Sequence, residues 1–202
     1  MPRRRWKCYR EPKFRGYQKK RSRSHRKEFV RGGADPKIRM FDIGNRAKPM
    51  NTFEIIIGLI IKRSRRLSHF ALEAIRVSAN RRLQDALGRE GFHMRVCVHP
   101  YDVYREHAMM AFAGADRLSS GMRKSFGRPV GRCARVHAGQ VIMKVGCDLK
   151  SLDVAKEAFY IAGNKITGAC RTVLLHAAKP EFIPKVPLPY IKLFYGPYTS
   201  AD

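Results

Sequence analysis

The feature that most constrains the fold of this chain is a long stretch, residues 105–132, that cannot form a core. It holds four glycines, six Lys or Arg and two acids, and no apolar run long enough to fold by itself. The flanking sequence is strand-like, with FHMRVCV at 92–98 and CARVHAGQVIMKV at 133–145. We therefore expect a flexible cationic loop, residues 105–128, held between strands. A surface loop without a role is the plain alternative, but loops of this length are uncommon without a function.

The charge of the chain points to a polyanionic partner. Forty-two Lys and Arg against sixteen Asp and Glu give a net charge of +26, while 44% hydrophobic residues are enough for a core. RNA or DNA is the usual partner of such a chain. A membrane surface would require a basic amphipathic helix with bulky apolar anchors, and the longest apolar run, Ile55–Ile61, is far too short to span a bilayer. No signal peptide is expected, because no apolar segment follows the basic first ten residues.

The cysteines and histidines give no sign of a metal site, a disulfide framework or a catalytic centre. The five cysteines form no C-x-x-C pair, and the seven histidines show no H-x-x-x-H spacing. We expect free thiols, with Cys97 and Cys133 packed like small apolar residues, and histidines at the surface or facing RNA. Nucleotide-binding and nucleophile motifs are absent from the sequence, so neither an enzyme nor a cofactor is expected.

Residues 1–31 predict a nucleic-acid-binding tail. They hold fourteen Lys or Arg and two Glu, with five aromatic residues interleaved. Such a segment cannot bury a core, but its rings can stack on unpaired bases, which a merely solubilising tail does not need. A nuclear-import signal is compatible with the same residues. The RNA-binding candidates in this tail and in the rest of the chain are Arg3, Arg4, Arg5, Trp6, Lys7, Arg10, Lys13, Arg15, Lys19, Lys20, Arg21, Arg23, Arg81, Arg95, Arg105 and Arg132.

The pattern becomes globular from Ile38. Residues 38–44 predict a strand with Ile38 and Met40 facing inward, and residues 53–61 predict a more buried strand. The stretch 62–88 has apolar residues at helical spacing from Leu67 onward and Gly88 as a C-terminal cap, which predicts a helix with a basic outer face. Residues 92–98 alternate as a strand that Pro100 ends.

The second half completes an α+β pattern. Two strands at 132–137 and 140–145 meet at Ala138-Gly139, a helix at 151–165 has Ser151 as its N-cap candidate, and a final strand lies at 170–177. Two helices that cover one face of a sheet predict an α+β sandwich. One globular domain, residues 32–177, is expected between the basic tail and a proline-rich extended tail, residues 178–202, that becomes ordered against a partner.

Four blocks of this sequence resemble a known family: GGADPKIRMFDIGN, ALEAIRVSANRRLQ, GFHMRVCVHPYDVYRE and AGADRLSSGMRKSFGRPVGRCARVHAGQVIMKV. They are similar to the large-subunit ribosomal proteins called L-ten in eukaryotes and L-sixteen in bacteria, over residues 32–146. The resemblance implies a hammerhead-like fold of two helices on a curved mixed sheet. It also implies a structural constituent of the large subunit that binds rRNA near the peptidyl-transferase centre. The partners implied are rRNA, tRNA, neighbouring ribosomal proteins, a transient assembly chaperone and maturation factors, in the cytoplasm.

The resemblance also implies roles for individual positions. Residues 105–117 match the family's flexible loop near the P site, and residues 117–129 match its basic return strand. The tRNA-proximal candidates are therefore His107, Met109, Arg117, Arg123, Lys124 and Arg128. The chain departs from the family in three segments. Residues 18–30 are longer and more basic than in the family, and residues 62–66 (KRSRR) replace a stretch that is commonly acidic. Residues 178–202 match nothing in the family.

Two other classes of function remain in view. An RNA-modifying or RNA-cleaving enzyme would need an acid–base pair, and the loop offers Glu106, His107 and Asp116. Adjacent residues on an irregular loop rarely converge on one substrate atom, so this reading is weak. A basic chromatin or membrane-surface protein is the third reading, and the sheet with two helices argues against it.

Overall fold

The computed structural model describes residues 35–106, Met122 and residues 128–177. The chain forms eight strands and two α-helices in these parts, together with two short 3-10 turns. Their bounds are β1 Asp42–Gly44, η3 Met50–Thr52, β2 Ile55–Ile61, β3 Arg65–Ser68, α2 His69–Leu87, β4 Phe92–Val96, β5 Asp102–Glu106, β6 Arg128–Val136, β7 Val141–Cys147, η5 Leu149–Ser151, α3 Leu152–Gly163 and β8 Cys170–Ala177.

The strands form two antiparallel sheets. A five-stranded sheet has the order β1-β4-β7-β2-β8, and a three-stranded sheet has the order β3-β6-β5. All strand pairs among the described residues are antiparallel, so the α+β class is confirmed and the expected mixed sheet is wrong.

The turn between β6 and β7 moves the chain from one sheet to the other. Gly139 adopts a φ of 81°, its amide donates to the carbonyl of Ile61 at 2.8 Å, and the amide of Ala138 donates to Ser64 Oγ at 3.0 Å. The two strands that the sequence predicts around Ala138-Gly139 are therefore present, but they belong to different sheets.

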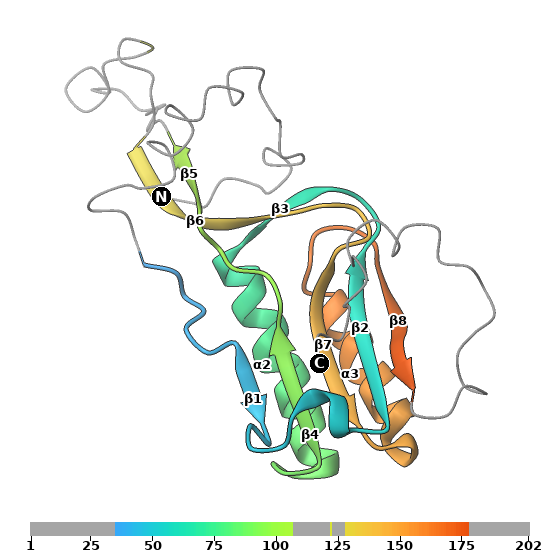
Figure 1. Cartoon of the computed structure of the whole chain (residues 1–202). Helices are drawn as coiled ribbons and strands as arrows, with labels where there is room; N and C mark the ends of the chain where they lie inside the picture. The colour runs from blue at the N-terminus through green and yellow to red at the C-terminus, as the bar shows by residue number, and fades with distance from the viewer. Residues whose placement is uncertain (1–34, 107–121, 123–127, 178–202) are drawn as a thin grey trace, which may run out of the picture.

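The two helices lie together on one face of the five-stranded sheet (Figure 1). The face of α2 that packs inward contributes Leu72, Ile75, Ala79 and Leu83, all fully buried. Helix α3 contributes smaller residues, with Phe159 as its one large buried side chain. The sheet residues that complete this core include Ile57, Leu59, Phe92, Met94, Met143 and Val145.

The predicted elements differ from the structure in several places. The strand predicted at 38–44 is confined to Asp42–Gly44, and the strand β5 was not predicted. Residues 65–68, expected in the first helix, form strand β3, because they pair with β6. Met40, expected to face inward, is 49% exposed, while Ile38 is buried. The N-cap candidate Ser151 makes no capping hydrogen bond, since it lies at the end of the 3-10 turn that leads into α3.

Both ends of the expected loop are strands. Residues 105–106 belong to β5 and residues 128–132 belong to β6, and the two strands pair as far as Glu106 opposite Arg128. Strand β3 pairs only with Cys133 and the three residues after it, so the outer part of β6 has β5 as its one partner in the described structure. We call this part, residues 103–106 paired with residues 128–132, the β5–β6 ribbon. It projects beyond the helices in Figure 1.

Candidate nucleic-acid interface

The positive charge of the described elements is unevenly distributed between the sheets and the helices. Strands β3, β5 and β6 together hold six arginines and two acids. Helices α2 and α3 together hold four basic and four acidic residues. The three-stranded sheet is therefore the cationic part of the ordered fold, and the helical layer is electrically balanced. Arginine guanidinium groups are suited to phosphate oxygens, because their donors form a planar fork.

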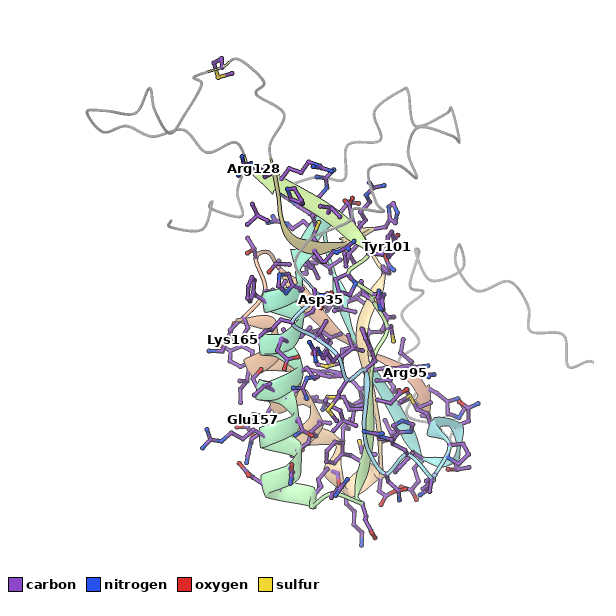
Figure 2. All side chains as sticks on the ribbon, turned by 90° about the vertical axis from the view of Figure 1, so that its left-hand side faces the viewer. Asp35, Arg95, Tyr101, Arg128, Glu157 and Lys165 are labelled. Atoms are coloured by element: carbon purple, nitrogen blue, oxygen red, sulfur yellow. The ribbon has the colours of Figure 1, made fainter. Side chains whose placement is uncertain are left out.

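The β5–β6 ribbon carries three of the predicted RNA-binding and tRNA-proximal residues. Arg128 is exposed at the outer end, where Figure 2 shows it farthest from Glu157 among the labelled residues, and Arg105 and Arg132 are half-buried. Tyr104 pairs with Gly131 and Arg105 pairs with Pro129, so Val130 is an extra residue in β6. Such a bulge changes the direction of the strand. Pro129, next to the bulge, has no N–H to donate, and this is tolerated because β3 does not pair with β6 at this position.

A buried carboxylate lies where the ribbon joins the rest of the sheet. Asp102, the first residue of β5, has a side chain only 6% exposed. Its two oxygens accept hydrogen bonds from Arg135 Nε at 2.9 Å and Arg135 Nη2 at 3.1 Å. Arg66 Nε lies 3.6 Å from Asp102 Oδ2. The sequence analysis did not identify Asp102, Arg135 or Arg66 as members of a cluster. In ARV at 134–136 a charged residue stands between two apolar ones, and this pattern could have drawn attention to Arg135.

The basic residues of the helices are mostly paired with acids. Arg76 Nε donates to Glu73 at 2.9 Å, Arg82 of α2 reaches Glu157 of α3 at 2.7 Å, and Lys156 reaches Asp153 at 3.0 Å. These pairs raise the pKa of the Arg76 and Arg82 guanidinium groups, chiefly through the hydrogen bonds to the two glutamates. Arg81, a predicted RNA-binding residue, is exposed on the same helix. The balanced charge makes this face a weaker candidate for phosphate contact than the three-stranded sheet.

Arg95, another predicted RNA-binding residue, lies on the five-stranded sheet. Its Nε is 2.7 Å from Asp42 Oδ1, across the β1–β4 pair, and its side chain is 54% exposed. His93 Nε2 lies 3.9 Å from the same carboxylate. Arg95 is therefore accessible to solvent, but Asp42 neutralises part of its charge.

The other predicted site residues lie outside the described parts of the chain. They are the twelve candidates of the N-terminal tail, Arg3, Arg4, Arg5, Trp6, Lys7, Arg10, Lys13, Arg15, Lys19, Lys20, Arg21 and Arg23, and the loop residues His107, Met109, Arg117, Arg123 and Lys124. The residues of the proline-rich C-terminal tail lie outside as well.

Two thiols of the fold, Cys133 and Cys147, are buried and only weakly acidic. Burial, and next the charge of Asp102, raise the pKa of Cys133 to about 12, and burial raises the pKa of Cys147 to about 11. Both stay protonated at neutral pH and are poor nucleophiles. Two expectations need correction, because Cys97 is exposed and His69 is buried, where its Nδ1 accepts the Lys37 amide at 2.8 Å. Residues 35–106 and 128–177 contain no cluster of three His, Cys, Asp or Glu that could hold a metal, and no helix among them is long and apolar enough to cross a membrane.

Comparison with known proteins identifies the family. The family described as Ribosomal protein L16p/L10e matches residues 16–173. The protein named "Large ribosomal subunit protein uL16" of Picrophilus torridus is 44% identical over 154 residues, which cover 76% of this chain and 86% of the relative. The protein of the same name from Thermofilum pendens is 43% identical over 152 residues, which cover 75% of this chain and 89% of the relative.

The family match extends beyond the blocks that carry the resemblance in the sequence. It takes in the whole of α3 and β8 as far as Val173, and it begins within the basic tail, at Gly16. The resemblance is therefore confirmed over most of the chain, and membership in a family of ribosomal proteins agrees with the expectation that the chain is not an enzyme. The chain belongs to the L16p/L10e family of ribosomal proteins.

Proposed function

We propose that this chain is a structural constituent of the large ribosomal subunit, where it binds rRNA near the peptidyl-transferase centre and helps to position tRNA. The relatives from Picrophilus and Thermofilum are named as proteins of the large subunit. The observation that carries the proposal for this chain is the separation of charge in its fold, with six arginines on β3, β5 and β6 and balanced helices.

The geometry of the ribbon supports a role in presenting the loop to RNA. Glu106 and Arg128 are paired, so the chain leaves the sheet and returns to it at adjacent positions. The intervening residues hold Arg117, Arg123 and Lys124, for which the family resemblance implies a position near tRNA. In this proposal the arginines of the sheet bind rRNA phosphates, and the loop cations contact tRNA. The role is positional and electrostatic, with no bond made or broken.

The finer parts of the proposal concern assembly and location. We propose that the chain joins the subunit late, in the cytoplasm, when maturation factors leave, and that a chaperone shields its basic start until then. Fourteen Lys or Arg in residues 1–31 support the need for such shielding, because an uncovered cationic tail binds nucleic acids without selection.

Sedimentation of a cell lysate that contains an affinity-tagged chain tests the proposal. Co-migration with large subunits is expected, and free migration would overturn it. A density map of the tagged particles then tests the location, since the three-stranded sheet should face rRNA and the loop should approach the tRNA sites. A map in which the helical layer faces rRNA and the three-stranded sheet faces solvent would contradict the proposed interface.

The salt dependence of RNA binding by the purified protein tests the electrostatic part separately. If six to ten phosphates are contacted, the affinity for purified large-subunit rRNA should fall about a thousandfold or more between about 50 and 200 mM salt, because bound cations release counterions. A flat response would mean that the charge of +26 serves another purpose.

A further inference from the structure

The inner end of the β5–β6 ribbon is attached to the fold at a buried side chain, Asp102. Two-stranded ribbons are marginally stable alone, so the ribbon depends on what holds its inner end. Cys133 of β6 pairs with Ser68 of β3 on one side and with Asp102 of β5 on the other, so the three strands meet at this level. Among the β5 side chains that the structure describes, Asp102 is the buried one, while Val103 and Arg105 are half-buried.

The contacts of Asp102 join all three strands. Its carboxylate accepts two hydrogen bonds from Arg135 of β6 and one from the amide of Val103 at 3.0 Å. The thiol of Cys133 lies 3.8 Å from Oδ2. Arg66 of β3 lies on the far side of β6 and is drawn to the same oxygen over 3.6 Å. A carboxylate that is held by a two-point guanidinium contact is fixed in direction as well as in distance.

The two arginines of this cluster repel each other. Arg66 and Arg135 are directly opposite in the β3–β6 pair, and their side chains are only 23% and 18% exposed. Like charges directly opposite on neighbouring strands are destabilising. Arg66 Nε is buried and makes no hydrogen bond among the described residues. The charge of Asp102 therefore offsets the repulsion between the two cations at the base of the ribbon.

We propose that Asp102 is the positioning residue of the β5–β6 ribbon. By joining β5 to β3 and to the inner part of β6, Asp102 fixes the direction in which the ribbon presents Arg105 and Arg128. The attachment itself stands without the proposed function, whereas its consequence for RNA binding rests on that function. The other pairs between described elements differ in kind. Asp42 with Arg95 and Glu157 with Arg82 are much more exposed, so water and salt screen them.

Amide hydrogen exchange of the full chain tests the attachment. The variant Asp102→Asn is compared with Asp42→Asn, which also removes a carboxylate from an arginine and changes the net charge equally. In Asp102→Asn, amides of β5 and of the outer half of β6 should exchange about tenfold faster or more, because a buried ion pair has lost one partner, while β2 and β7 keep their protection. Asp42→Asn should leave the ribbon unchanged. Equal exchange of the ribbon in the two variants would overturn the proposal.

A second substitution separates the charge of Asp102 from its packing. Arg66→Gln in the Asp102→Asn background removes the repulsion between the two arginines, so it should restore part of the lost protection. A side chain that only fills space would not be rescued in this way, and absence of rescue contradicts the electrostatic role. If Asp102→Asn does not fold, Arg135→Lys replaces it, since lysine keeps the charge but loses the two-point contact. That variant should also speed exchange in the ribbon, and wild-type exchange would overturn the proposal.

Binding of the same variants to purified large-subunit rRNA tests the consequence. If charge alone mattered, both Asp→Asn variants would bind more tightly than the wild type, to the same extent. Positioning predicts that Asp102→Asn binds more weakly than Asp42→Asn, and equal affinities would contradict this consequence. If the wild-type protein does not bind the rRNA, the proposed function fails, and the exchange comparison still decides the role of Asp102.

Discussion

The hydroxyl of Ser68 accepts a hydrogen bond from the amide of Ala71 at 3.0 Å, so the last residue of β3 is also the N-cap of α2. Ser68 is buried and lies opposite Cys133 in the β3–β6 pair. One side chain therefore couples the end of the cationic sheet to the start of the helix that covers the five-stranded sheet.

Replacement of Ser68 by alanine should destabilise the fold by about 1 kcal/mol, because the part-buried amide of Ala71 loses its acceptor. Denaturant unfolding followed by circular dichroism measures this change. Ser78→Ala in the same helix is the matched control, since the Ser78 hydroxyl only donates back to the carbonyl of Ile75 at 3.2 Å. That control should change stability by less than about 0.5 kcal/mol. Equal effects at the two positions would show that the cap is unimportant.

The start of α2 also shows where sequence reasoning stops. The buried positions Leu72, Ile75, Ala79 and Leu83 repeat at helical spacing, so the helix and its inner face could be predicted. The four residues before it, RRLS, contain no strand signal of their own. They are extended because β6 pairs with them, and a contact between residues about seventy positions apart is not visible in a local pattern.

The same limit applies to the candidate site. The positive charge of this stretch could be read from composition, and Arg105, Arg128 and Arg132 do lie together on the ribbon. The strand β5 at the start of the expected loop was not predicted. Asp102 could not be found in this way, because its importance comes from two arginines on other strands. The antiparallel arrangement of both sheets could not be predicted either. The alternation of apolar and polar residues shows which side chains of a strand face the core, but not which strand pairs with it.

Gly44 at the end of β1 should tolerate no side chain. Its φ is 89°, and a Cβ would collide with the carbonyl oxygen of Phe92 on the paired strand. Gly44→Ala should therefore cost about 3 kcal/mol, from strain and overlap together. Gly88→Ala is the control, because Gly88 has a φ of 69° but no atom within 4 Å of the place that an alanine methyl group would take. It should cost about 1 to 2 kcal/mol from backbone strain alone. Thermal unfolding of both variants checks the difference, and equal losses would contradict the overlap.

The uneven charge of the fold predicts unequal effects of equal charge changes. Arg128→Gln with Arg132→Gln should reduce the slope of log affinity for rRNA against log salt by about two, one for each lost phosphate contact. Arg82→Gln with Lys156→Gln removes the same charge from the helical layer, where both cations are paired with acids. Filter binding over a salt series should show a nearly wild-type slope for this second pair. Equal slopes would show that the interface is not confined to the three-stranded sheet.

The basic start should matter for incorporation more than for folding. Replacing Arg3, Arg4, Arg5 and Lys7 by alanine should leave the melting temperature unchanged, since the core begins at Ile38. The same variant should incorporate poorly into large subunits, as measured by sedimentation of tagged protein. A control with lysine at Arg3, Arg4 and Arg5 keeps the charge and shows whether the guanidinium groups themselves are needed. Normal incorporation of the alanine variant would remove this segment from the binding account.

Deletion of residues 108–119 should separate the function of the loop from the stability of the fold. All strands and helices that the structure describes remain in the deleted chain, and residues 107 and 120–127 suffice to close a hairpin between Glu106 and Arg128. Folding and rRNA docking should therefore persist. Maturation factors should stay on the subunit, or tRNA accommodation should slow, because Arg117 and the reach of the loop are lost.

Mass spectrometry of purified subunits and the rate of translation in reconstituted ribosomes measure these two effects of the deletion. A Gly/Ser segment of equal length in place of residues 108–119 is the control, since it restores reach without charge. If that control is as defective as the deletion, the charge and side chains of the loop are required. If it restores activity, length alone matters and the electrostatic role of Arg117 is wrong. Wild-type translation and factor release with the deletion itself would show that the loop is a surface connection without a role.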